Sequence, residues 1–172
     1  MKRSLRLLVF SFFPLFWALS AIPQADGPKG KEGDLYSIAL AASIDEMQKS
    51  WGHIDDSDNG TSVRTDYSHV IVKQDPRITN GLPTQFGSHR IEYLDVQALI
   101  KRYNTLGKKL AVLEISPMVN EGARLKIDVF VSWFSHRHRR AMFELSDWSD
   151  VEFQFDCDRQ TFVISSVKLG GI

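Results

Sequence analysis

The sequence has only one cysteine, Cys157, among its 172 residues. A single thiol forms no disulfide within the chain, so a small disulfide-stapled scaffold is excluded and packing must supply the stability. Val151, Phe153 and Phe155 alternate with polar residues ahead of Cys157. A strand over residues 151–157 would therefore turn all four side chains inward, and Cys157 is expected to be a small buried core residue rather than a nucleophile.

Short motifs of the common chemistries are also missing. There is no G-x-S-x-G, no H-E-x-x-H, no Walker loop and no dinucleotide fingerprint. No internal repeat and no low-complexity tract is present. These absences lower the odds of an enzyme without excluding one, and the sequence alone indicates no catalytic, cofactor-binding or metal-binding residue.

The most informative segment is residues 1–21. Three basic residues among the first six precede an uncharged apolar run, Leu7–Ala21, with Ala18 and Ser20 placed as a small-x-small cleavage signal. This order is typical of a secretory signal peptide. The run is shorter than the ~20 residues that a spanning helix needs, and Pro14 interrupts it, so cleavage is favoured over retention as an anchor.

We therefore expect an exported protein, periplasmic or secreted after cleavage. Residues 22–33, rich in Pro, Gly and Lys, predict a flexible lead, and residues 34–172 predict a single domain. Cleavage removes three of the 21 basic residues and none of the 21 acidic ones, which leaves a net charge of −3. A mildly acidic chain argues against a nucleic-acid partner, which needs a basic face.

The apolar pattern of residues 34–172 predicts an α+β domain. One helix is expected from Asp34 to about Ser50, and a second between the cap Asp95 and the stop Gly107. Short turns join most of the expected strands and force antiparallel neighbours, with the two helices covering the apolar face of the sheet. The expected strands cover residues 68–73, 89–94, 110–115, 124–134, 141–148, 151–157 and 161–169.

One stretch resembles a known superfamily. A helix is expected to lead into a long hairpin across the segments VQALIKRY (residues 96–103), LAVLEI (110–115) and EGARLKIDVFVSW (121–133). This order resembles the cone-shaped superfamily of nuclear transport factor two and the SnoaL-like proteins, over roughly residues 35–169. The resemblance implies a curved antiparallel sheet covered by two helices on one face, and an apolar pocket lined from Tyr103, Val131 and Trp133. A cystatin-like sheet wrapped on one helix is the alternative.

A calcium loop is the sharpest candidate site. Residues 55–66 match positions one, three, five, six and twelve of an EF-hand loop. Ser62 stands where an aliphatic residue is usual, Asp66 is shorter than the usual Glu, and a strand is expected next instead of a helix. We therefore expect a solvated polar loop and no bound metal.

Three other groups have two interpretations each. The basic segment HRHRR (residues 136–140) could bind an anion or an acidic membrane surface, but a solvated hairpin turn is favoured. Asp147 and Asp150 would serve acid–base chemistry, but a strand bulge or turn is favoured. His69, with Asp75 nearby in sequence, would be a general base in a pocket, but a lone strand histidine is more often structural.

Taken together, these features favour an exported binding or interaction module that takes a small hydrophobic ligand or a protein partner. Membrane contact is expected only through the signal segment. The alternative is a small cofactor-independent lyase, isomerase or hydrolase of the SnoaL-like kind that uses His69 or an Asp. Whether any ionisable side chain points into the cavity discriminates the two hypotheses, and a cavity lined only by apolar groups would exclude this enzyme.

The first prediction concerns processing. The mature N-terminus is expected to be Ala21 or Ile22, because the small residues before them satisfy the cleavage signal. Intact-mass measurement of the exported protein checks this. A full-length species held in the membrane fraction would show that the apolar run is an anchor.

Overall fold

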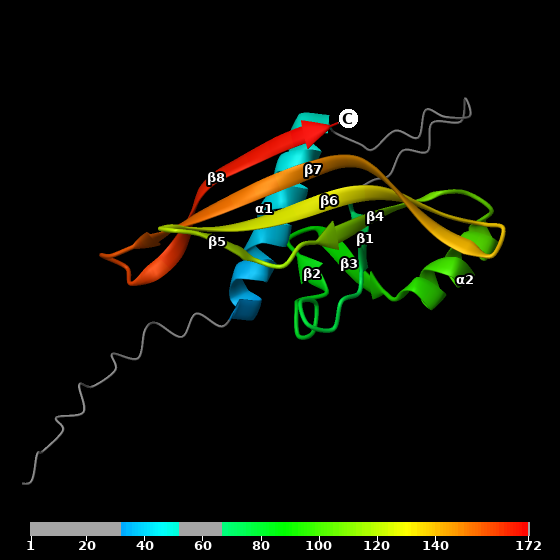
Figure 1. Cartoon of the computed structure of the whole chain (residues 1–172), viewed down its shortest axis with the longest axis horizontal. Helices are drawn as coiled ribbons and strands as arrows, with labels where there is room; N and C mark the ends of the chain where they lie inside the picture. Colours follow the sequence, from blue (N-terminus) through cyan, green and yellow to red (C-terminus); the bar gives the residue numbers. More distant parts are fainter. Residues whose placement is uncertain (1–31, 52–66, 172) are drawn as a thin grey trace, which may run out of the picture.

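The computed structural model describes residues 32–51 and 67–171, with side chains from Leu35 onward (Figure 1). The predicted signal peptide, most of the lead and the predicted calcium loop lie outside the described residues. Two helices and eight strands follow in this order: α1 (Glu32–Trp51), β1 (His69–Lys73), β2 (Gln85–Phe86), β3 (His89–Leu94), α2 (Val96–Leu106), β4 (Leu110–Ile115), β5 (Val119–Glu121), β6 (Arg124–Arg137), β7 (Arg140–Asp156) and β8 (Thr161–Gly171).

Both helices form where the apolar spacing predicts them. In α1 Leu40, Ile44 and Met47 are spaced by four and three residues and are fully buried, so they form one apolar face of the helix. The helix begins at Glu32, two residues before Asp34, so the predicted cap at Asp34 is wrong. Among the described residues no helix is long and apolar enough to cross a bilayer.

The ends of α2 are confirmed in detail. The Asp95 side chain accepts a hydrogen bond from the amide of Ala98 at 2.7 Å, which satisfies one free amide of the first turn. At the other end Gly107 has a φ of 65°, and its amide donates to the carbonyl of Tyr103. Glycine adopts this left-handed conformation without a steric penalty, so the helix stops there.

The strands form one sheet in the order β2-β3-β1-β4-β6-β7-β8, with β5 paired to β6. The α+β class is confirmed, but the expectation of a purely antiparallel sheet is wrong. Strand β1 is parallel to both β3 and β4. The helix α2 connects β3 to β4 as a crossover past β1 and returns the chain to the same end of the sheet, so β3 and β4 run parallel to each other. Strand β1 lies between them and runs in the same direction.

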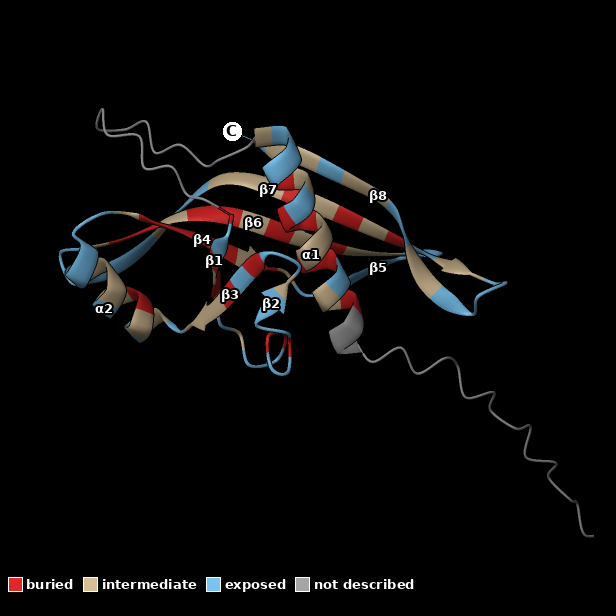
Figure 2. Cartoon of the chain, turned by 180° about the vertical axis from the view of Figure 1, so that it is seen from behind, coloured by how far each residue is buried: buried red, intermediate tan, exposed pale blue. Residues whose placement is uncertain are grey.

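The two helices pack on opposite faces of this sheet, so the expectation that both cover one face is wrong. Along β4, Leu110 and Val112 pack with Leu99 of α2, whereas Ala111 and Leu113 belong to the larger core on α1. Successive strand side chains point to opposite faces, so the two helices lie on either side of β4. The buried positions accordingly gather on the central strands and on the inner surface of α1 (Figure 2).

The long hairpin of β6 and β7 differs from the prediction at one place. Residues 141–148 and 151–157, expected as two strands, belong to the single strand β7. The expected break at residues 149–150 is absent, because Ser149 and Asp150 pair in register with Val129 and Asp128. A bulge lies earlier in the strand: Val131 pairs with Asp147 and Ser132 with Leu145, which leaves Ser146 as an extra residue.

Strand β7 stops one residue before Cys157. The Asp156 carboxylate accepts hydrogen bonds from the amides of Asp158 and Arg159, at 2.9 and 3.1 Å, and so begins the turn into β8. Val151 and Phe153 are fully buried as predicted, but Cys157 is exposed in the turn. The predicted core role of Cys157 is therefore wrong.

The second prediction tests this core. Phe153→Ala should lower the free energy of unfolding by about 3–5 kcal/mol, because Phe153 is fully buried and truncation leaves a cavity. Its cross-strand neighbour Ile164 is 38% exposed, and Ile164→Ala should cost less than about 1 kcal/mol. Urea unfolding of the two variants measures both values, and equal losses would contradict the inward orientation of Phe153.

Candidate functional site

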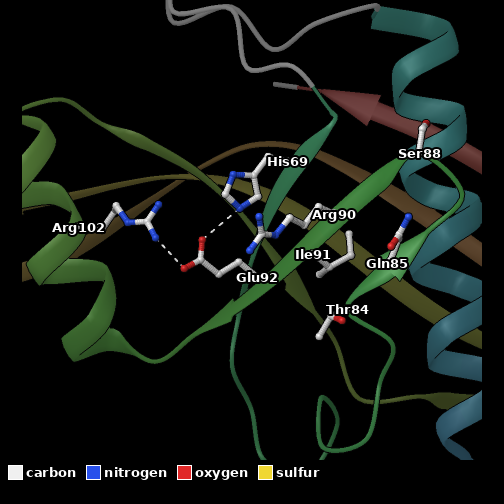
Figure 3. Close-up of a pocket in the computed structure, with 8 residues that line it drawn as sticks. All are labelled: His69, Thr84, Gln85, Ser88, Arg90, Ile91, Glu92 and Arg102. Atoms are coloured by element: carbon white, nitrogen blue, oxygen red, sulfur yellow. Dashed lines mark hydrogen bonds and ion pairs between the residues drawn. The ribbon is translucent and has the colours of Figure 1, made fainter.

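A cavity of about 660 Å³ lies at the β1–β3 end of the sheet, beside α2 (Figure 3). Its lining is mostly polar and consists of His69, Thr84, Gln85, Ser88, Arg90, Ile91, Glu92 and Arg102. Four of these residues are ionisable, namely His69, Arg90, Glu92 and Arg102. A lining of this kind suits a charged or hydrogen-bonding ligand better than an apolar one.

The parallel pairing of β1 with β3 assembles the cavity. Its register places His69 beside Arg90 and Ile71 beside Glu92. Residues two apart on a strand share a face, so His69, Arg90 and Glu92 project on the same side of the sheet as α2. Arg102 completes the group from one turn before the end of that helix.

Glu92 is the centre of the group. Its Oε2 lies 3.1 Å from Nε2 of His69, and its Oε1 accepts a hydrogen bond from Nη2 of Arg102 at 2.6 Å. Figure 3 shows the three side chains pointing toward one another from β1, β3 and α2. A carboxylate only accepts hydrogen bonds, so a neutral His69 carries its proton on Nε2 and presents the lone pair of Nδ1.

The charges of the cavity do not cancel. Arg90 and Arg102 face the single carboxylate of Glu92, so the cavity is cationic even when His69 is neutral. Among the described residues Arg90 makes no ion pair, and Figure 3 shows its guanidinium beside the imidazole of His69. The side chains of His69 and Glu92 are 44% and 30% exposed, so water and salt screen their attraction and the pair contributes little to stability.

One wall of the cavity is held in place by Tyr93. The Tyr93 hydroxyl donates a hydrogen bond to the carbonyl of Pro83 at 2.8 Å, directly before Thr84 and Gln85. Burial raises the pKa of Tyr93 to about 12, so the phenol keeps its proton and remains a donor at neutral pH. This hydrogen bond fixes the segment that carries Thr84 and Gln85 against β3.

Of the sequence candidates that the structure describes, only His69 lies in this cavity. Asp75, considered as its acidic neighbour, lies beyond the far end of β1. Its carboxylate instead accepts hydrogen bonds from the backbone amide and the guanidinium of Arg77. The true partner is Glu92, which sequence reasoning missed together with Arg90 and Arg102. The alternation of Arg90 and Glu92 in HRIEYL was the available signal, but only the parallel register makes it meaningful.

The two carboxylates of SDWSD do not form a pair with each other. Across the hairpin Asp150 faces Asp128, and Lys126 Nζ lies 3.1 Å from Asp128 and 3.3 Å from Asp150. Burial and the neighbouring Asp150 raise the pKa of Asp128, against the effect of Lys126. The bulge expected in this segment is confirmed at Ser146.

The basic segment HRHRR (residues 136–140) forms the exposed tip of the β6–β7 hairpin. His138 and Arg139 both have positive φ values there, 50° and 62°, as in a two-residue type I′ turn. The predicted solvated turn is confirmed.

The predicted apolar pocket is not formed. Tyr103 packs on Phe134 in the α2 core, with ring centroids 6.2 Å apart, whereas Val131 and Trp133 belong to the α1 core on the other face. The described residues contain no group of three potential metal ligands.

No family model matches the chain, and no curated protein or solved structure is similar enough to match it.

Proposed function

We propose that this chain is an exported binding module whose cavity takes a small molecule through a carboxylate or phosphate group. The observation that carries the proposal is the cavity lining: two guanidinium groups and an imidazole surround a single carboxylate. Arginine is well suited to planar, bidentate recognition of carboxylate and phosphate. The proposal that the protein is exported rests on the predicted signal peptide, residues 1–21. Membership of the cone-shaped superfamily is likewise a proposal.

Arg90 is the first contact for the ligand. Glu92 already occupies Arg102 and His69 as an internal anion, whereas Arg90 makes no ion pair among the described residues. An incoming anion therefore binds at Arg90 and competes with Glu92 for the other two groups. This replaces the hydrophobic ligand expected from the sequence, because the cavity is lined by ionisable side chains.

The third prediction tests Arg90. Acetate and inorganic phosphate, titrated against chloride at constant ionic strength, should shift the NMR amide signals of the cavity residues. Arg90→Gln should weaken this binding about tenfold, since a hydrogen bond to a charged group contributes about 1.5–3 kcal/mol.

The matched control is Arg159→Gln, which removes the same charge in the exposed β7–β8 turn, away from the cavity. It should leave the affinity unchanged. Absence of signal shifts with both anions, or an equal loss of affinity in Arg159→Gln, would overturn the proposal, because binding would then be absent or would reflect net charge only.

A second function has its own supporting observation, the His69–Glu92 pair. A histidine oriented by a carboxylate and offering Nδ1 is the arrangement of a general base, which suits a small cofactor-independent lyase, isomerase or hydrolase. Glu92 would then be a positioning residue for His69.

The fourth prediction separates the two functions through Glu92→Gln. In a binding module this change removes the internal competitor, and acetate affinity should rise several-fold. In an enzyme it should lower a His69-dependent rate, for example p-nitrophenyl acetate hydrolysis that His69→Gln abolishes. Weaker acetate binding in Glu92→Gln together with such a rate would favour the enzyme.

A further inference from the structure

A second cavity, of about 300 Å³, lies on the other side of the Glu92–Arg102 ion pair. It is lined by Glu92, Leu94, Ala98, Lys101, Arg102 and Thr105. The helical residues are spaced by three, one and three, which places them on one face of α2. Glu92 and Leu94 are two apart on β3 and share the facing side of the strand. The cavity is therefore a groove between α2 and β3.

The two cavities share Glu92 and Arg102. The ion pair between these residues lies where the two cavities adjoin, and the two cavities together are called the groove below. Arg90 lies in the first half and Lys101 in the second, while Leu94 and Ala98 contribute apolar surface to the second half. The groove thus has one further cation in each half and the Glu92–Arg102 ion pair between them.

We infer that this groove takes an elongated ligand with an anionic group at each end, one bound at Arg90 and the other at Lys101. The inference rests on the proposed function, since it assigns the ligand class of the same site. The Glu92–Arg102 ion pair at the junction has no net charge, so the middle of the ligand needs no charge of its own. A dicarboxylate with an aliphatic spacer meets this description, and a chain of consecutive phosphates does not.

The length of the spacer follows from the strand. Arg90 and Leu94 are four residues apart on β3, which corresponds to about 13 Å along the strand. One long cationic side chain lines each cavity, Arg90 the first and Lys101 the second, so a ligand that contacts both is shorter than this span. Suberate, an eight-carbon dicarboxylate, is long enough to contact both, and succinate is too short.

The test compares suberate with octanoate and succinate by NMR titration of the purified protein at constant ionic strength. Octanoate has the same chain with one carboxylate, and succinate has two carboxylates on a short spacer. Suberate should bind about tenfold more tightly than either, because only suberate engages both ends of the groove. Lys101→Gln should abolish this advantage and leave acetate affinity unchanged.

The matched control is Lys49→Gln, which removes an exposed lysine of α1. Suberate that binds no more tightly than octanoate, while acetate still binds at Arg90, would overturn the elongated ligand and leave the proposed function standing. Equal loss of suberate affinity in Lys49→Gln and Lys101→Gln would also overturn it. Failure of acetate, phosphate and suberate alike would overturn the proposed function itself.

Discussion

Burial of β4 on both faces is the constraint on which the rest of the structure depends. Four consecutive residues of this strand, Leu110–Leu113, are buried, so each face of the strand must be covered. The chain covers one face with α1 and the other with α2. Because α2 covers the second face, it crosses from β3 to β4 past β1, and the parallel direction of β3 and β4 follows from that crossover.

The candidate site is a consequence of the same arrangement. Parallel pairing places His69 beside Arg90, and the crossover helix brings Arg102 against Glu92. An antiparallel sheet with both helices on one face would have placed Arg102 elsewhere. The smaller core of Leu99, Leu110, Val112 and Phe134 therefore supports the site as well as the fold, since it fixes α2 on this face.

Local signals in the sequence predicted the local structure well. Apolar spacing and the cap at Asp95 located the helices, because a helix is decided largely by its own residues. The tertiary arrangement was not predicted, because no single segment of the sequence determines the parallel register of β1 or the face of the sheet that α2 covers. The apolar run Leu110–Leu113 was the available signal for a strand buried on both faces. The Glu92 site could be found only once the parallel register of β1 and the face covered by α2 were known.

Methyl–aromatic NOE spectroscopy tests the placement of the helices most directly. The account predicts contacts from Leu99 of α2 to the ring of Phe134, and from Ile44 of α1 to Val129 and Val131, with no contact between Leu99 and Val131. Contacts from Leu99 to Val131 would place both helices on one face. They would contradict the two-sided core and, with it, the assembly of the Glu92 site.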